Sequence, residues 1–130
     1  MPFAAVDYEG VNERPSADRT VLIVEDEADI RDSLREVLED EGYRVAVAAN
    51  GKEGLEQLAR LARPCAVVLD IIMPVMSGSE LYRAMQADPE LAGIPVLVST
   101  SDPSRAPSGV LIMKKPIDLD RFLDAVAKLF

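Results

Sequence analysis

The segment Ala66–Gly78, with the sequence AVVLDIIMPVMSG, carries an apolar strand directly into a carboxylate and then into a turn. A continuous apolar run of this length is typical of a strand buried in a parallel sheet. The ligands of open parallel sheets bind outside the carboxyl ends of the strands, so Asp70 is a candidate reacting group at that edge. The plainer interpretation is an aspartate that ends a strand and caps a turn.

Three other short apolar segments also run into polar residues. Their ends carry, in order, an acidic pair, hydroxyls and two lysines: Glu25-Asp26 after Val21–Val24, the end of Pro95–Ser101, and the end of Val110–Pro116. A phosphoryl group needs such a set, namely a nucleophile, a metal site, a hydroxyl donor and a cation. Clustered carboxylates repel one another unless a cation lies between them, and Mg²⁺ suits a site with few carboxylates. The acidic pair also fits a simpler role, as an acidic start to the following helix.

Helical patterns separate these predicted strands. Apolar residues recur at helical spacing in four segments: about Ala28–Asp40, from Asn50-Gly51 to Pro64, from Ser79 to near Asp88-Pro89, and from Asp118 onward. Tyr43–Ala48 alternates as a second strand. Strands that alternate with helices predict an α/β fold, here a doubly wound, flavodoxin-like parallel sheet of five strands in the order 2-1-3-4-5.

The length of 130 residues and a hydrophobic content of 48% suit one domain with an ordinary core. Residues 1–18 lack sustained periodicity and are predicted to be a flexible N-terminal extension, with the domain at 19–130. No stretch is apolar enough to span a bilayer and the start lacks a basic secretory signal, so we expect a cytoplasmic protein. The single cysteine, Cys65, begins an apolar strand and is expected to be a small core residue.

Charge and the lack of histidine exclude several classes of function. The net charge is −9, and the lysines and arginines are scattered among acids, which argues against direct binding to nucleic acid. With no histidine, the chain cannot carry a phosphohistidine, build a Ser-His-Asp triad or offer imidazole to zinc. Any phosphohistidine donor must therefore be a separate protein.

With these residues in view, the chain resembles the receiver domain of two-component response regulators from about Arg19 to Phe130. The matching features are the acidic pair after the first strand, the segment from Asp70 to Gly78, the threonine after the fourth strand and the Lys-Pro pair after the fifth. The resemblance implies that Asp70 accepts a phosphoryl group from a histidine kinase or histidine phosphotransfer protein. It also implies the other roles at the site: Mg²⁺ held by Glu25, Asp26, Asp70 and the backbone carbonyl of Ile72, phosphoryl oxygens bonded by Thr100, and Lys115 paired with them or with Asp70.

The segment Ser101–Val110 departs from the receiver pattern, which has a fourth helix there. Two prolines and a glycine leave no room for a normal helix, so we predict that the helix is missing or reduced to about one turn. The face that often relays phosphorylation in the family should then be remodelled. Ile112 stands where many receivers have an aromatic residue, so we hypothesise that any switch uses the loop itself, ordered by the aspartyl phosphate.

Ile72 and Asp102 occupy positions that in the family influence how water reaches the phosphoryl group. An apolar Ile72 cannot orient water, which predicts slow self-dephosphorylation unless Asp102 acts on the water instead. Ile72 also argues against a phosphatase like the haloacid dehalogenases, which need a second aspartate at that position. A pseudo-receiver that only binds partners is a further alternative, disfavoured by the complete acidic set, Thr100 and Lys115.

The expected product is an aspartyl phosphate that carries a signal by protein contact, so we do not expect a conventional enzyme. No effector domain is expected after the last helix, and the chain is interpreted as a stand-alone receiver or a piece of a larger protein. The downstream partner is not specified by the sequence. Apolar surfaces of the first or last helix are candidate sites for a homodimer.

Overall fold

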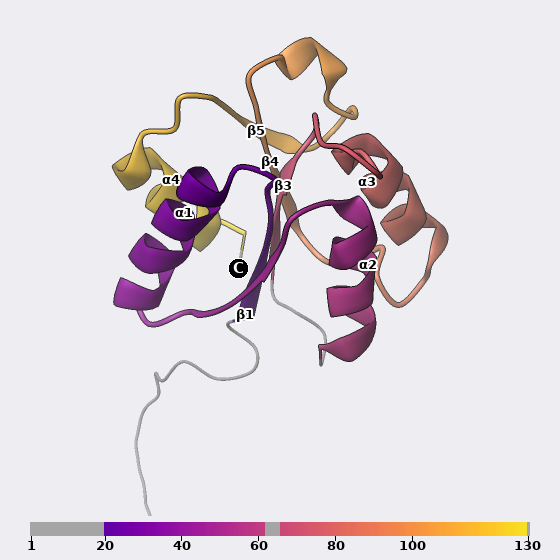
Figure 1. The fold of residues 1–130 in the computed structure, drawn as a ribbon, viewed down its shortest axis with the longest axis horizontal. Coiled ribbons are helices and arrows are strands. Elements are labelled where there is room, and N and C mark those ends of the chain that lie inside the picture. The colour runs from indigo at the N-terminus through magenta and orange to yellow at the C-terminus, as the bar shows by residue number, and fades with distance from the viewer. Residues whose placement is uncertain (1–19, 62–65, 130) are drawn as a thin grey trace, which may run out of the picture.

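A computed structural model describes residues 20–61 and 66–129 of the chain. A parallel sheet lies between two layers of helices, with α1 and α4 on one face and α2 and α3 on the other (Figure 1). The elements follow one another as β1 (Thr20–Val24), α1 (Ala28–Asp40), β2 (Arg44–Ala48), α2 (Gly51–Arg60), β3 (Ala66–Asp70), α3 (Gly78–Ala87), β4 (Val96–Thr100), η2 (Pro103–Arg105), β5 (Leu111–Lys114) and α4 (Leu119–Ala127).

The sheet has the strand order β2-β1-β3-β4-β5, and every pair in it is parallel. This confirms the predicted flavodoxin-like fold and its order. The register aligns the strand ends: Val24 pairs with Leu69, Asp70 with Ser99, and Thr100 with Lys114. Residues that follow β1, β3, β4 and β5 therefore meet at one edge of the sheet.

The three central strands are buried along their whole length, which explains their continuous apolar sequences. Their side chains alternate between two cores. Leu22, Leu69 and Leu81 belong to the core on the side of α2 and α3. Ile23 and Phe122 belong to the core on the side of α1 and α4.

Local sequence sets the helix boundaries. The helix predicted over Ala28–Asp40 is present with those bounds, and the Asn50 side chain caps α2 by accepting from the Glu53 amide. At α3, the Ser77 hydroxyl and the Glu80 carboxylate form a capping box, each accepting from the other's backbone amide. None of the helices in the described part of the chain combines the length and apolar character needed to cross a bilayer. The predictions for residues 1–18, Pro64 and Cys65 lie outside the described residues.

The connection between β4 and β5 is short, as predicted. Only residues 101–110 separate the two strands, and they contain a single 3-10 turn, η2, in place of a fourth helix. The Asp102 carboxylate caps this turn by accepting from the Ser104 amide, and Ala106 packs against the core. On β5, Leu111 is 44% exposed and Ile112 is 38% exposed, because little of the chain covers this edge strand. The last helix, α4, follows β5.

Candidate functional site

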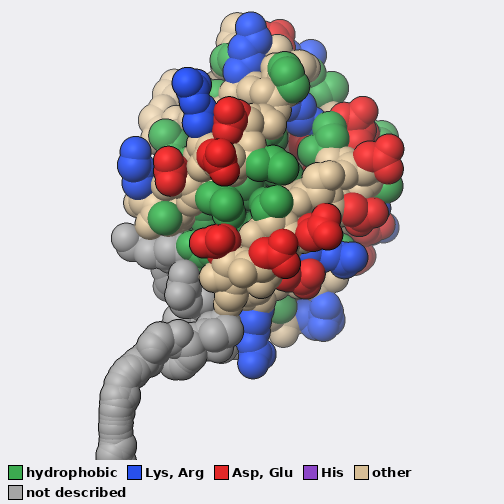
Figure 2. All heavy atoms as spheres, turned by 90° about the vertical axis from the view of Figure 1, so that its left-hand side faces the viewer, with side chains coloured by type: hydrophobic (Ala, Val, Ile, Leu, Met, Phe, Trp, Pro, Cys, Tyr) green, Lys and Arg blue, Asp and Glu red, His purple; other side chains and the backbone are tan. Residues whose placement is uncertain are grey.

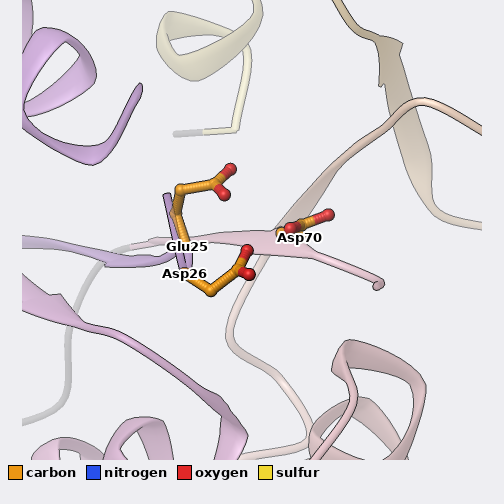
Figure 3. A group of neighbouring side chains, drawn as sticks. All are labelled: Glu25, Asp26 and Asp70. Carbon is orange, nitrogen blue, oxygen red and sulfur yellow. The ribbon is translucent and has the colours of Figure 1, made fainter. Parts of the chain in front are cut away.

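Three carboxylates meet at the carboxyl edge of the sheet. Glu25 and Asp26 directly follow β1, and Asp70 ends the neighbouring strand β3 (Figure 3). One oxygen from each side chain lies within 4.8 Å of the others. Glu25 and Asp70 are buried, whereas Asp26 is exposed and leaves the cluster open to solvent.

Lys115 brings the only ammonium that the described residues pair with this cluster. Its Nζ lies 2.8 Å from Glu25 Oε1 and 3.5 Å from Asp70 Oδ2, so the closer partner is Glu25. A third, longer contact of 3.8 Å reaches the exposed Glu27. One half-buried ammonium therefore offsets part of the negative charge of three carboxylates.

The electrostatics of the site disfavour a charged Asp70. Burial raises the pKa of Asp70 to about 7, and the neighbouring Glu25 charge adds to the effect, although Lys115 and the Ile72 amide oppose it. For Lys115, burial acts to lower the pKa, but the hydrogen bond and charge of Glu25 and the charge of Asp70 outweigh it. The Lys115 pKa therefore lies above its ordinary value, and the ammonium stays charged.

Hydrogen bonds that involve the backbone surround the two buried carboxylates. The Glu27 amide donates to Glu25 Oε2 at 3.1 Å, and the Arg31 guanidinium donates to the Glu25 carbonyl oxygen at 2.9 Å. The Ile72 amide points to Asp70 Oδ1 at 3.4 Å, which brings the backbone of Ile72 beside the carboxylate. The donor set consists of hard carboxylate oxygens with excess negative charge, and such a set fits a small divalent cation such as Mg²⁺.

The loop after Asp70 folds closely beneath the strand end. The Gly78 amide donates to the Ile71 carbonyl oxygen at 3.0 Å, and a Cβ on Gly78 would lie 2.0 Å from the Asp70 carbonyl oxygen. Glycine is therefore required there. Val75, at the tip of this loop, has a φ of 70°, an uncommon conformation for a β-branched residue. The loop is thus a constrained structure packed against the backbone of Asp70.

Thr100 lies at the same edge, at the end of β4, and is fully buried. Its hydroxyl accepts from the Asp102 amide at 3.1 Å and donates weakly to the Asp102 carbonyl oxygen at 3.4 Å. The Thr100 carbonyl oxygen accepts from the Lys115 amide at 2.9 Å. The threonine hydroxyl therefore bonds the loop after β4, and its backbone bonds the residue that carries the ammonium.

Sequence reasoning missed one residue of the site, Ser99. It pairs in register with Asp70, and its side chain is buried without a hydrogen-bond partner among the described residues. The run of three hydroxyl residues that ends β4 was a signal, but only the register shows which of them lies beside Asp70. The sequence also did not show that Lys115 bonds Glu25 more closely than Asp70.

An apolar groove lies next to the acidic cluster, between α1 and α4. It has a volume of about 320 Å³ and is lined by Asp29, Ile30, Ser33, Leu34, Lys115, Pro116, Ile117 and Leu119. Figure 2 views this side of the molecule, where apolar side chains gather between acidic ones. Lys115 lines the groove and also contacts the buried carboxylates, so the groove and the site adjoin.

Comparison with known proteins gives consistent matches. The family model of the response regulator receiver domain matches residues 21–127. A response regulator receiver protein of Anaeromyxobacter sp. is 36% identical over 111 residues, which cover 82% of this chain and 46% of that protein. The polar-differentiation response regulator DivK of Brucella anthropi is 34% identical over 115 residues, which cover 83% of this chain and 93% of DivK.

A solved structure matches the fold. The response regulator TrrA of Thermotoga maritima, in complex with Mg²⁺–BeF, is similar with a TM-score of 0.76 and 27% identity, covering 86% of this chain and 99% of that one. This chain therefore spans less than half of the Anaeromyxobacter protein and nearly all of DivK and TrrA.

Proposed function

This chain belongs to the family of response regulator receiver domains, and we propose that Asp70 is its phosphoacceptor. The observation that carries the proposal is the meeting of Asp70, two further carboxylates and the Lys115 ammonium at one edge of the sheet. The donor is a phosphohistidine on a histidine kinase or histidine phosphotransfer protein. The domain comprises residues 19–130, and residues 1–18 form a separate N-terminal extension.

In the proposed reaction, a carboxylate oxygen of Asp70 attacks the phosphorus in line with the bond to the donor's imidazole nitrogen. The new O–P bond forms as the P–N bond breaks, its electron pair returns to the imidazole, and that nitrogen takes up a proton from solvent. Lys115 neutralises charge on the phosphoryl oxygens, and Thr100 donates its hydroxyl to one of them. The product is an aspartyl phosphate, so the chain is a signalling module and not a conventional enzyme.

The proposed metal is Mg²⁺, held by Glu25, Asp26, Asp70 and the backbone carbonyl of Ile72. The fit rests on the cluster of three carboxylates, on the exposed Asp26 that leaves it accessible, and on its excess negative charge. When bound, Mg²⁺ supplies positive charge that favours the ionised form of Asp70 and offsets charge on the phosphoryl oxygens. The Mg²⁺–BeF complex of TrrA supports the choice of metal.

The groove between α1 and α4 is the proposed contact for the phosphate donor. It is apolar, it is bordered by acidic side chains, and Lys115 joins it to the site, so a donor seated there would present its histidine to Asp70. A donor with an apolar ridge and basic flanks fits this surface. We place the protein in the cytoplasm, where it passes the signal on by protein contact and not by binding nucleic acid directly.

The test is intact-mass detection of phosphorylation after incubation with acetyl phosphate and Mg²⁺. We expect one phosphoryl group on the wild type and none on Asp70→Ala or in a metal-free control. Asp124→Asn, an exposed aspartate on α4, should be labelled like the wild type. If neither acetyl phosphate nor a competent kinase labels the wild type, the pseudo-receiver alternative replaces the proposal.

The aspartyl phosphate is expected to be long-lived. The Ile72 side chain, 45% exposed beside the site, offers no hydrogen bond to an attacking water. The Asp102 carboxylate accepts from the Ser104 amide at 3.2 Å and from its hydroxyl at 2.5 Å, and is therefore occupied within the loop. We predict a lifetime of minutes or more in a phosphate-release assay, and a shorter one for Ile72→Glu. A wild-type half-life of seconds would contradict this.

A further inference from the structure

Among residues 20–61 and 66–129, Ser99 is the buried polar side chain without a hydrogen-bond partner. It lies in β4, is 2% exposed, and its hydroxyl makes no hydrogen bond within the described part of the chain. Buried hydroxyls in native proteins are nearly always bonded, so each exception calls for an explanation. One explanation is that the partner arrives only in another state of the site.

The register shows what lies around this hydroxyl. Ser99 pairs with Asp70 on one side and with Met113 on the other, and side chains paired across parallel strands point to the same face. That face is the one covered by α1 and α4, because Leu97 and Met113 both pack in that core. Ser99 and Asp70 are therefore side-chain neighbours on one face of the sheet.

The Lys115 side chain passes over the same strands. Lys115 follows β5, and its ammonium reaches Glu25 at the end of β1, so the side chain extends across β4 and β3, which lie between these two strands. Lys115 also lies two residues after Met113, on the face that Ser99 shares. On its way from β5 to Glu25 the side chain therefore crosses the strand that carries Ser99, on the face that Ser99 and Asp70 share.

We propose that Ser99 is a positioning residue for Lys115, whose ammonium donates to the Ser99 hydroxyl oxygen when the site is loaded with metal and a phosphoryl group. The inference rests on the proposed function. In the free site the shortest contact of the Lys115 ammonium, at 2.8 Å, is with Glu25 Oε1. A divalent cation competes for the Glu25 carboxylate, which frees an N–H of the ammonium. Ser99, on the strand between β5 and β3, offers a buried hydroxyl oxygen that has no partner within the described residues.

The proposed role of Ser99 predicts different effects of Ser99→Ala on two properties: the stability of the free protein and the bond to the ammonium in the loaded protein. A purely structural serine would affect both states alike. In the free protein the hydroxyl has no partner, so Ser99→Ala removes an unsatisfied group and should leave the unfolding midpoint unchanged or higher. In the loaded protein the same change removes a bond to the ammonium. Ser99→Thr keeps the hydroxyl and should retain the bond.

The experiment measures denaturant unfolding midpoints of the 130-residue chain, free and with increasing concentrations of Mg²⁺ plus beryllofluoride, the phosphoryl mimic, so that the midpoint shift reports how tightly the mimic binds. We expect Ser99→Ala to match or exceed the wild type when free, and to bind the mimic at least fivefold more weakly. Ser99→Thr should restore binding to within twofold of the wild type. Ser108→Ala, which removes an exposed loop hydroxyl, should behave as the wild type in both states.

A second readout follows the Lys115 ammonium itself by ¹H–¹⁵N NMR. In the loaded wild type its protons should exchange with water more slowly than in loaded Ser99→Ala, with no such difference between the free proteins. The proposal is overturned if Ser99→Ala is destabilised when free yet binds the mimic as the wild type does. If Asp70 is labelled normally and the variants do not differ, Ser99 alone loses its role. If wild-type Asp70 accepts no phosphoryl group, both proposals fail together.

Discussion

Asp70 lies between opposing influences, and its chemistry depends on which of them prevails. Burial and the Glu25 carboxylate favour the protonated acid, whereas the Lys115 ammonium and the Ile72 amide favour the anion. The result is a carboxyl group whose pKa of about 7 lies within the physiological range. The proposed nucleophile must be ionised, and further positive charge at the site would increase the ionised fraction of Asp70 at neutral pH.

Replacing Asp70 by asparagine should stabilise the metal-free protein above pH 7. The pKa of Asp70 is raised from 3.8 to about 7, so between these values the unfolded chain loses a proton that the folded chain keeps, and stability falls as pH rises. Asp70→Asn removes this loss, so its free energy of unfolding at pH 8 should exceed that of the wild type by roughly 1 to 3 kcal/mol. The gain is smaller than the full pKa shift implies, because the substitution also removes a charged partner of Lys115.

The measurement is urea unfolding at pH 4.5, 6 and 8 in the presence of a chelator. The advantage of Asp70→Asn should shrink as the pH falls and vanish near pH 4, where Asp70 is protonated in both states. Asp124→Asn serves as the exposed control and should show no such trend. An advantage of Asp70→Asn that is independent of pH would contradict the assignment.

Single residues also mark the limit of what the sequence predicts. The type and order of polar residues after each strand were enough to predict that Glu25, Asp70 and Lys115 belong to one site. The closer pairing of Lys115 with Glu25 and the unpartnered hydroxyl of Ser99 depend on side-chain positions in three dimensions. No local sequence pattern predicts either feature, because each depends on contacts between strands that are distant in sequence.

Among the elements, the β4–β5 connection is the most unusual. Prolines at 103 and 107 and a glycine at 109 predicted the loss of a helix, since none of them suits a helix interior, and η2 is the single turn that remains. The helix over Ala28–Asp40 was predicted with equal success from its apolar spacing. The observed strand ends differ by one or two residues from the predicted ones. The backbone of an end residue pairs only where the neighbouring strand continues beside it, and the sequence pattern does not show where that is.

Amide exchange should report whether this connection responds to phosphorylation. Thr100 bonds both the amide and the carbonyl of Asp102, so donation of its hydroxyl to a phosphoryl oxygen would require a new arrangement of the loop. We predict increased protection across residues 101–109 when Mg²⁺ and beryllofluoride are added. Amides of α2 and the Asp70→Asn variant are the controls, and both should be unaffected. Unchanged protection of 101–109 in the wild type would rule out the loop as the responding element.

In the whole molecule, two apolar cores hold the sheet rigid while the functional groups gather at its edge. The cores lie on opposite faces of the sheet and include neither Asp26 nor Lys115, so the charged site can change state without a change in core packing. Binding of a cation to the folded chain alone should therefore appear as added stability of the entire domain.

Magnesium should stabilise the wild type but not Asp26→Asn. Asp26 is exposed, so its replacement should alter metal-free stability by no more than about 0.5 kcal/mol. At a free Mg²⁺ concentration ten times its dissociation constant, the wild type should gain about 1.4 kcal/mol, seen as a higher unfolding midpoint. Asp29→Asn, an exposed aspartate in the first turn of α1, is the matched control and should keep the gain. Equal gains in wild type and Asp26→Asn would remove Asp26 from the metal site.

The pairing of β5 with β4 has a consequence for how such a protein can diversify. Four register pairs, from Leu97 with Leu111 to Thr100 with Lys114, deliver Lys115 to the site whatever the length of the chain between the strands. Residues 103–110 can therefore be exchanged, shortened or extended by mutation without moving the ammonium. New sequence grafted between Asp102 and Val110 would change the surface beside the site, while Asp70 and Lys115 keep their places at the sheet edge.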